Sequence, residues 1–299
     1  MRVEINPDLL RWACERAGLT TRIVAQRIPQ LLSWENGIKT PTLKQLEHFA
    51  AHVHVPIGYL FLNTPPVEET PIPDFRTTEN FRIGHPSPDL LDTIYLCQQR
   101  QEWYREFALT MHESPSSYVG SVTLNDSIKD VAKHIRHVLK FDIEIRRDLS
   151  TWEDALRQFI AQADEAGILV MVSGVVGNNN NRKLNHEEFR GFALSDPLSP
   201  LIFINGADTK SAQMFTLAHE LAHIWLGKTA LSDSSPITLP TNTIENWCNR
   251  VAAEMLVPED FLYQEFKPDS DLSDQTTRLA RLFKVSTLVI LRRIYDLGY

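Results

Sequence analysis

Residues 214–226 read Met-Phe-Thr-Leu-Ala-His-Glu-Leu-Ala-His-Ile-Trp-Leu and contain two histidines and a glutamate within five positions. Apolar residues surround the charged ones, which predicts a buried helix that begins after Asp208 or Thr209 and ends at Gly227. Residues four apart in a helix project from the same face. The imidazoles of His219 and His223 can therefore meet one metal ion, with Glu220 beside it.

This arrangement suits hydrolytic chemistry. Zinc favours nitrogen ligands, and a catalytic zinc site keeps one position open for water. Glu220 can take the proton of that water, because the metal lowers the pKa of the water toward about 7. The alternative is a structural cluster of hydrogen-bonded side chains, since two histidines and a glutamate in a buried helix need partners or a ligand.

A third ligand is expected from the next predicted helix, residues 243–256, which ends before Pro258. Glu245 and Asn249 are four residues apart and share a face of this helix. Glu254 follows nine residues after Glu245, which is about 180° around the helix. We therefore predict Glu245 as the metal ligand and Asn249 as the group that orients a ligating histidine. Glu254 is the competing candidate.

The paired motifs resemble the ImmA/IrrE family of zinc metallo-endopeptidases. That family shows a HExxH helix and then a helix of the form E-x-x-A-N-x-F-A-A-x-L-L-x-P. Here the second motif is Glu245-x-x-Cys-Asn249-x-Val-Ala-Ala-Glu-Met-Leu-Val-Pro258, so Cys248 replaces alanine and Val251 replaces phenylalanine. A regulatory thiol on the metal is conceivable at Cys248, but a small core cysteine is the simpler interpretation.

The resemblance covers about residues 120–299. It implies a minimal zincin-like, gluzincin-like domain with a small β-sheet and Zn2+ held by the motif residues. Characterised members of this family cleave a helix-turn-helix repressor and so release stress, mobile-element or defence genes. The resemblance therefore implies a repressor-type protein substrate, or a cognate partner in a toxin–antitoxin arrangement.

Residues 7–62 resemble the helix-turn-helix domain of the Xre class. About four residues are missing between Ala25 and Glu35 relative to that class, so the recognition region is shortened. Residues 1–75 carry seven Lys and Arg against eight Asp and Glu, whereas phosphate binding needs clustered positive charge. Contact with a partner protein is expected, and DNA binding is the weaker alternative. The resemblance rests on Leu10, Ala17, Gly18, Leu19, Ala25, Trp34, Glu35, Asn36, Gly37, Pro41, Thr42 and Leu46.

The predicted fold class is α+β and mainly helical. The predicted parts are a helix-turn-helix-like domain over residues 1–64, a Pro-rich linker and connecting helix over 65–115, and a metallopeptidase domain over 116–299. Six prolines between positions 63 and 88 exclude a continuous helix there. Strands are expected at 167–173, 189–194 and 201–205, the last as an edge for an extended peptide. Residues 177–181 and 228–241 are expected to be loops.

Composition restricts the compartment and the partners. The net charge of −8 argues against a uniformly basic nucleic-acid binder. Three widely spaced cysteines form no disulfide framework. The acidic N-terminus is unlike a secretory signal, so we expect a cytoplasmic protein without a membrane partner. The leading hypothesis is a zinc endopeptidase. The alternative is a non-proteolytic regulator or antitoxin-like binding protein, which would not need Glu220.

Overall fold

The computed structural model describes residues 2–75, 86–232, 242–267 and 271–299. The chain divides into two compact units. The first comprises Met1–Pro71 and Ile83–Asp92, and the second comprises Ile72–Arg82 and Thr93–Tyr299. The domain boundaries expected from the sequence stay predictions. Among the described helices, none is long and apolar enough to cross a membrane.

The first unit is helical. Its N-terminal caps follow from the sequence, because Thr20 and Thr42 each accept a hydrogen bond from the third backbone N–H that follows. At Thr42 the side chain of Gln45 closes a capping box. The second helix is short and ends at Ala25. The elements are α1 (Pro7–Arg16), α2 (Thr21–Ala25), α3 (Leu31–Glu35), α4 (Leu43–His52) and the 3-10 helix η1 (Ile57–Phe61).

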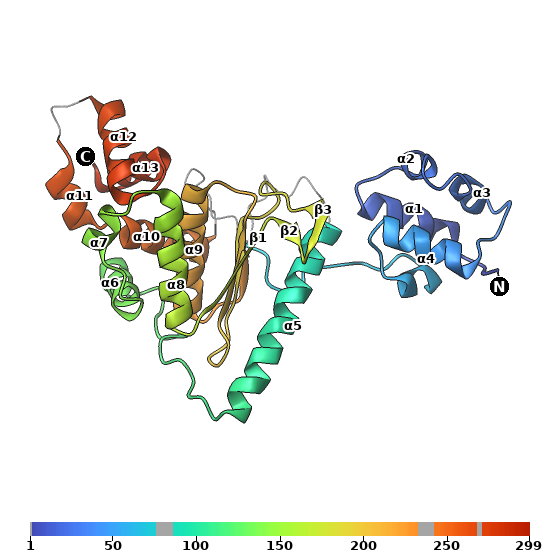
Figure 1. The fold of residues 1–299 in the computed structure, drawn as a ribbon, viewed down its shortest axis with the longest axis horizontal. Helices are drawn as coiled ribbons and strands as arrows, with labels where there is room; N and C mark the ends of the chain where they lie inside the picture. The colour runs from blue at the N-terminus through green and yellow to red at the C-terminus, as the bar shows by residue number, and fades with distance from the viewer. Residues whose placement is uncertain (1, 76–85, 233–241, 268–270) are drawn as a thin grey trace. The chain divides into compact units, whose positions relative to one another are not determined.

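The second unit combines helices with a small sheet, which confirms the α+β class (Figure 1). Helix α5 (Pro88–Thr110) begins in the first unit and continues into the second. The other helices are α6 (Ile128–Val138), α7 (Ile143–Arg147), α8 (Trp152–Glu165), α9 (Lys210–Leu226), α10 (Thr243–Leu256), α11 (Glu259–Glu265), α12 (Leu272–Phe283) and α13 (Thr287–Leu297). The strands are β1 (Leu169–Ser173), β2 (Val175–Val176), β3 (Asn179–Lys183), β4 (Gly191–Leu194), β5 (Leu201–Asn205) and β6 (Ala230–Ser232).

The main sheet has the strand order β1-β5-β4-β6. Strand β5 runs parallel to β1 and antiparallel to β4, so it lies inside the sheet. The prediction that residues 201–205 form an edge was therefore wrong; the edge strand beyond β4 is β6. Two predicted loops contain strands, because β2 and β3 form a hairpin and β6 begins at Ala230. Residues 233–241 of the second loop lie outside the described residues.

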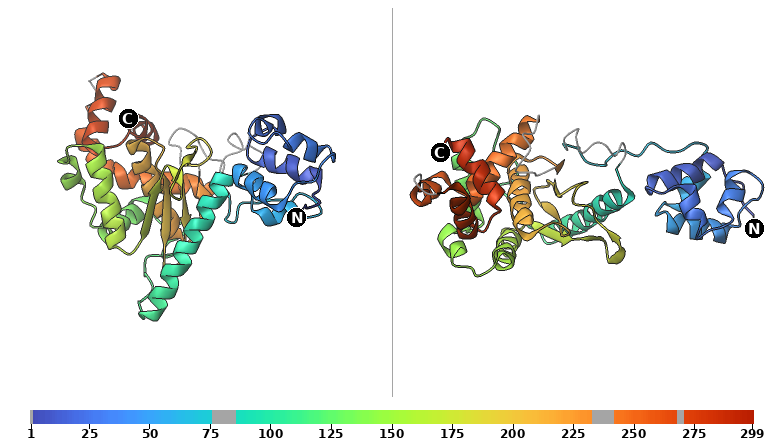
Figure 2. Two further views of the ribbon diagram at one scale, coloured as in Figure 1. Left: turned by 45° about the vertical axis from the view of Figure 1, so that its right-hand side comes forward. Right: turned by 90° about the horizontal axis from the view of Figure 1, so that it is seen from above.

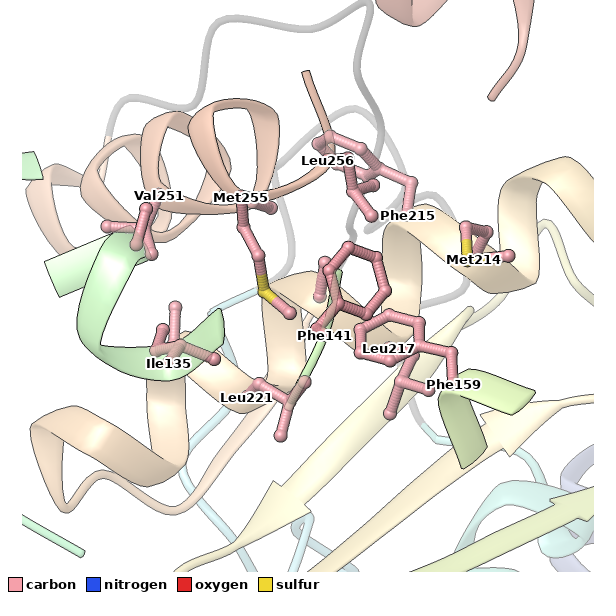
Figure 3. Close-up of a cluster of buried hydrophobic side chains, with 14 of the residues drawn as sticks. Ile135, Phe141, Phe159, Met214, Phe215, Leu217, Leu221, Val251, Met255 and Leu256 are labelled. Atoms are coloured by element: carbon pink, nitrogen blue, oxygen red, sulfur yellow. The ribbon is translucent and has the colours of Figure 1, made fainter. Parts of the chain in front are cut away.

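Helix α9 is the centre of the second unit. It packs on β4 and β5 and against α8 and α10. Views from several sides show α8 and α9 on one face of the sheet and the part of α5 from Thr93 onward on the other (Figures 1 and 2). Phe215, Leu217 and Leu221 of α9 enter a cluster of buried side chains with residues from α8 and α10 (Figure 3). The apolar side chains of α9 therefore pack in the core. His219, Glu220 and His223 are the buried polar residues at the centre of the same helix.

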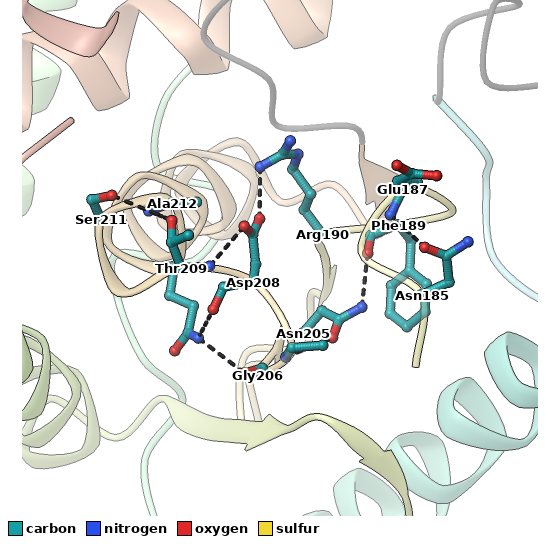
Figure 4. A network of polar contacts seen from close by, with 12 residues as sticks. Asn185, Glu187, Phe189, Arg190, Asn205, Gly206, Asp208, Thr209, Ser211 and Ala212 are labelled. Atoms are coloured by element: carbon teal, nitrogen blue, oxygen red, sulfur yellow. Dashed lines mark hydrogen bonds and ion pairs between the residues drawn. The ribbon is translucent and has the colours of Figure 1, made fainter. Parts of the chain in front are cut away.

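The start of α9 is fixed by polar contacts at the end of β5 (Figure 4). The amide of Asn205 donates to the carbonyl oxygen of Phe189, 3.1 Å away. Arg190 forms an ion pair with Asp208 at 2.6 Å. Thr209 caps the helix by accepting from the N–H of Ala212. These contacts fix the residue at which α9 begins. The position of the first residue in turn fixes the positions of the two histidines further along the helix.

Candidate metal centre

The two histidines of α9 lie side by side in the interior. Both side chains are fully buried. The Nε2 atoms of His219 and His223 are 3.1 Å apart, and the ring centroids are 4.9 Å apart. The helical spacing therefore brings the two ring nitrogens to one point, as the sequence predicts.

Glu245 approaches the same point from the first turn of α10, which begins at the capping residue Asn242. One carboxylate oxygen of Glu245 lies 3.2 Å from Nε2 of His219 and the other lies 3.0 Å from Nε2 of His223. Among the described residues, His219, His223 and Glu245 make up the group that could hold a metal ion.

The donor set fits a small divalent cation. Bonds of about 2.0–2.1 Å from a tetrahedral cation place neighbouring ligand atoms about 3.3 Å apart, close to the observed separations. Both oxygens of Glu245 and Nδ1 of His223 are buried without a well-formed hydrogen bond, which is costly unless another ligand satisfies them. Burial raises the pKa of a carboxyl group, but at Glu245 the histidines outweigh it and lower the pKa to about 2.

Glu220 lies next to this cluster and is also fully buried. Its Oε2 is 3.5 Å from Oγ of Ser232, and its Oε1 has no hydrogen-bond partner within the described part of the chain. Burial raises the pKa of Glu220 to about 8. A divalent cation nearby would favour the carboxylate, because an opposite charge stabilises the ionised form. The free oxygen can then accept a proton.

Asn249 contacts His219 from the turn of α10 that follows Glu245. Its Oδ1 lies 2.9 Å from Nδ1 of His219. An amide oxygen accepts, so Nδ1 carries the hydrogen and Nε2 keeps its lone pair for a ligand. This is the contact expected of a group that orients a metal-binding histidine.

Replacing Asn249 by alanine is expected to weaken metal binding by about 10- to 100-fold without changing the stoichiometry. The expected cause is loss of the acceptor that fixes the ring of His219. Asn249→Asp retains an acceptor oxygen and should bind more tightly than Asn249→Ala. Competition with a chromophoric chelator measures both affinities; equal affinities for wild type and Asn249→Ala would show that the contact is not used.

Ser232 is a site residue that the sequence analysis missed. Its hydroxyl lies 3.2 Å from Nε2 of His223 and it is fully buried on β6. No sequence motif includes Ser232. The residues around it, 228–241, were predicted to form a loop. The three residues Ala230–Ser232 are too few to predict a strand from the sequence.

The other two residues considered as metal ligands, Glu254 and Cys248, are not part of the group of converging ligand atoms. Glu254 is buried in an ion pair with Arg293 of α13, and it accepts from the N–H of Glu259. Cys248 is fully buried, and burial raises its pKa far above the usual range. A thiol with a raised pKa is a poor source of the thiolate that binds metals. The geometry therefore agrees with Glu245 and not with Glu254 as the third donor.

Gly191 of β4 permits the close approach of the sheet to α9. A β-carbon at this position would lie 2.6 Å from a methyl carbon of Thr216, 2.8 Å from the carbonyl oxygen of Phe203 and 3.3 Å from Oε1 of Glu220. We expect Gly191→Ala to lower the free energy of unfolding by about 1–3 kcal/mol, because a packed interior must shift. Gly58→Ala is the control, since a β-carbon there meets nothing within 4 Å. Urea denaturation compares the two; equal stabilities would contradict the close packing.

Comparison with known families agrees with this geometry. Residues 163–295 match the model of the Peptidase_M78 family, described as the IrrE N-terminal-like domain. The matched range contains His219, Glu220, His223, Glu245 and Asn249. A comparison with curated proteins gives no significant match. The family match supports a metallopeptidase with a divalent metal at the two histidines and the glutamate.

Proposed function

We propose that this chain is a zinc-dependent endopeptidase with Glu220 as its general base. The observation that carries the proposal is the position of Glu220, a buried carboxylate with a free oxygen beside three converging ligand atoms. A purely structural metal site needs four protein ligands and no adjacent base. Three ligands and a free carboxylate are the composition of catalytic zinc sites.

Each residue has a role in this proposal. His219, His223 and Glu245 would hold the ion, and Asn249 would keep the ring of His219 in place. The chemistry that a bound zinc ion would supply is polarisation of the peptide carbonyl and a lowered pKa for water, to about 7. Glu220 takes a proton from the attacking water and passes it to the departing amine. The apolar surroundings exclude bulk water, which strengthens these electrostatic interactions.

We further propose a regulatory, repressor-type protein as the substrate, in a stress, mobile-element or toxin–antitoxin setting. The support is the resemblance of the two motifs to ImmA/IrrE enzymes, together with the separate helical unit over residues 1–71. That unit would recognise a partner protein. In the region that would read DNA in an Xre-like domain, helix α3 spans only Leu31–Glu35, so reading of DNA is the less favoured role.

The experiment that tests the proposal identifies new protein termini. Zinc-loaded wild type and Glu220→Gln are each incubated with a lysate of the source cells, and new N-termini are identified by mass spectrometry. Termini that appear with wild type alone, in one or a few regulatory proteins, are the expected result. Identical sets of termini would reject the peptidase. They would favour the alternative, a regulator that acts by binding.

A further inference from the structure

The segment Ile72–Phe75 pairs with the edge strand beside the metal centre. It belongs to the same compact unit as that centre, whereas Met1–Pro71 belongs to the other. The N–H of Phe75 donates to the carbonyl oxygen of Leu231, and the N–H of Leu231 donates to the carbonyl oxygen of Pro73, both at 2.9 Å. The pairing of Asp74 with Leu231 is parallel. The segment thus forms a parallel β-bridge with the outer edge of β6.

This edge lies next to the proposed catalytic groups. Ser232 follows Leu231 in β6, and its hydroxyl reaches Nε2 of His223 and Oε2 of Glu220. The ring of Phe75 lies 6.3 Å from the ring of His223, measured between centroids. The side chain of Ile72 is buried, with 5% of its surface exposed. Two backbone hydrogen bonds and the ring of Phe75 therefore hold the segment beside the site.

We infer that the outer edge of β6 is a docking edge for an extended peptide, and that Ile72–Phe75 occupies it as an internal competitor. This inference rests on the proposed peptidase function. Addition of an extended peptide to a sheet edge is a general mode of recognition, in which backbone hydrogen bonds give affinity and side-chain pockets give specificity. The ring of Phe75 next to His223 places an apolar side chain beside the metal ligands.

Occupation by the chain's own segment lowers the apparent affinity for any other peptide. A tethered segment competes at an effective concentration that can reach the millimolar range. The apparent dissociation constant rises in proportion as the open fraction falls. A foreign peptide must therefore displace residues 72–75 before it reaches the metal centre.

The test measures peptide binding without cleavage. The probe is a fluorescein-labelled peptide with the sequence of residues 70–75, Thr-Pro-Ile-Pro-Asp-Phe. All proteins are full-length, zinc-loaded and carry Glu220→Gln, so that the probe stays intact. Phe75→Pro removes the N–H that donates to Leu231, and it keeps Asp74 extended, because a residue before proline favours that conformation. Val67→Pro is the control, since Val67 lies in the same Pro-rich stretch and is 82% exposed.

Fluorescence anisotropy should show that Phe75→Pro binds the probe about tenfold more tightly than the parent, as expected when a lost hydrogen bond opens the edge. Val67→Pro should match the parent. Phe75→Ala removes the ring alone and should give about threefold tighter binding, which tests the inference even if Phe75→Pro does not fold. Equal affinity in all four proteins, or no binding in any, would overturn the inference.

Failure of this inference is distinguishable from failure of the proposed function. Equal probe affinities together with cleavage that depends on Glu220 would reject the internal competitor and leave the peptidase intact. Tighter probe binding by Phe75→Pro, without any cleavage that depends on Glu220, would reject the peptidase and leave a peptide-binding edge.

Discussion

Glu220→Gln should abolish most peptide hydrolysis and leave the metal stoichiometry unchanged. The amide of glutamine has nearly the same shape as the carboxylate, but it cannot accept the proton of the attacking water. General-base catalysis contributes about 10²–10⁴-fold, so the expected loss in kcat/KM lies in that range. Glu220 does not belong to the group of three ligand atoms, so the variant should still bind one metal ion, with an affinity lowered by the loss of a nearby negative charge.

The measurement is kcat/KM on a protein substrate identified by its new termini, with metal content determined on the same samples. Ser232→Ala is a useful companion variant, because it removes the hydroxyl that approaches Oε2 of Glu220 and keeps the carboxylate. We expect it to retain more activity than Glu220→Gln. If Glu220→Gln kept at least half of the wild-type kcat/KM, another group would have to be the base.

Glu245→Gln should cost the metal site most of its affinity. The substitution removes a negative charge and replaces one of the two carboxylate oxygens, which lie 3.2 Å from Nε2 of His219 and 3.0 Å from Nε2 of His223. Loss of an outer partner typically costs 10- to 100-fold in metal affinity. Loss of a direct ligand should exceed about 100-fold. Titration with zinc in the presence of a competing chelator gives the affinity, and wild type and variant are compared at one pH.

Glu254→Gln is the matched control for this prediction, since it changes the second buried glutamate of the same helix. Glu254 pairs with Arg293, and both side chains are at most 8% exposed. Breaking a buried pair costs about 3–5 kcal/mol, so Glu254→Gln should lower the free energy of unfolding and still bind zinc with near wild-type affinity. If Glu254→Gln lost zinc affinity and Glu245→Gln kept it, Glu254 and not Glu245 would be the metal ligand.

The two helices that carry the candidate site, α9 and α10, were predictable because local rules decide where they begin and which residues share a face. Capping residues such as Thr42 and Thr209 satisfy free backbone N–H groups, and they mark helix starts from the sequence alone. Helical periodicity also separates Glu245 from Glu254, because nine residues turn a side chain to the opposite face. The ion pair of Glu254 with Arg293 agrees with that reasoning.

The sheet edge was not predictable, because long-range pairing decides it. Asn179–Lys183 is polar and reads as a loop, yet it pairs with β2 as a hairpin. Strand β6 has only three residues, Ala230–Ser232, and the strand with which it pairs, β4, is remote in sequence. The placement of Pro73–Phe75 beside β6 depends on contacts across more than 150 positions. No local pattern contains that information.

X-ray absorption at the zinc edge tests the central claim most directly. The full-length protein is loaded with one equivalent of zinc and the ligand shell is determined. We predict four nitrogen or oxygen neighbours at about 2.0–2.1 Å, with the outer scattering of two imidazole rings. A sulfur neighbour at about 2.3 Å, a single imidazole, or failure to retain zinc would contradict a centre built from His219, His223 and Glu245.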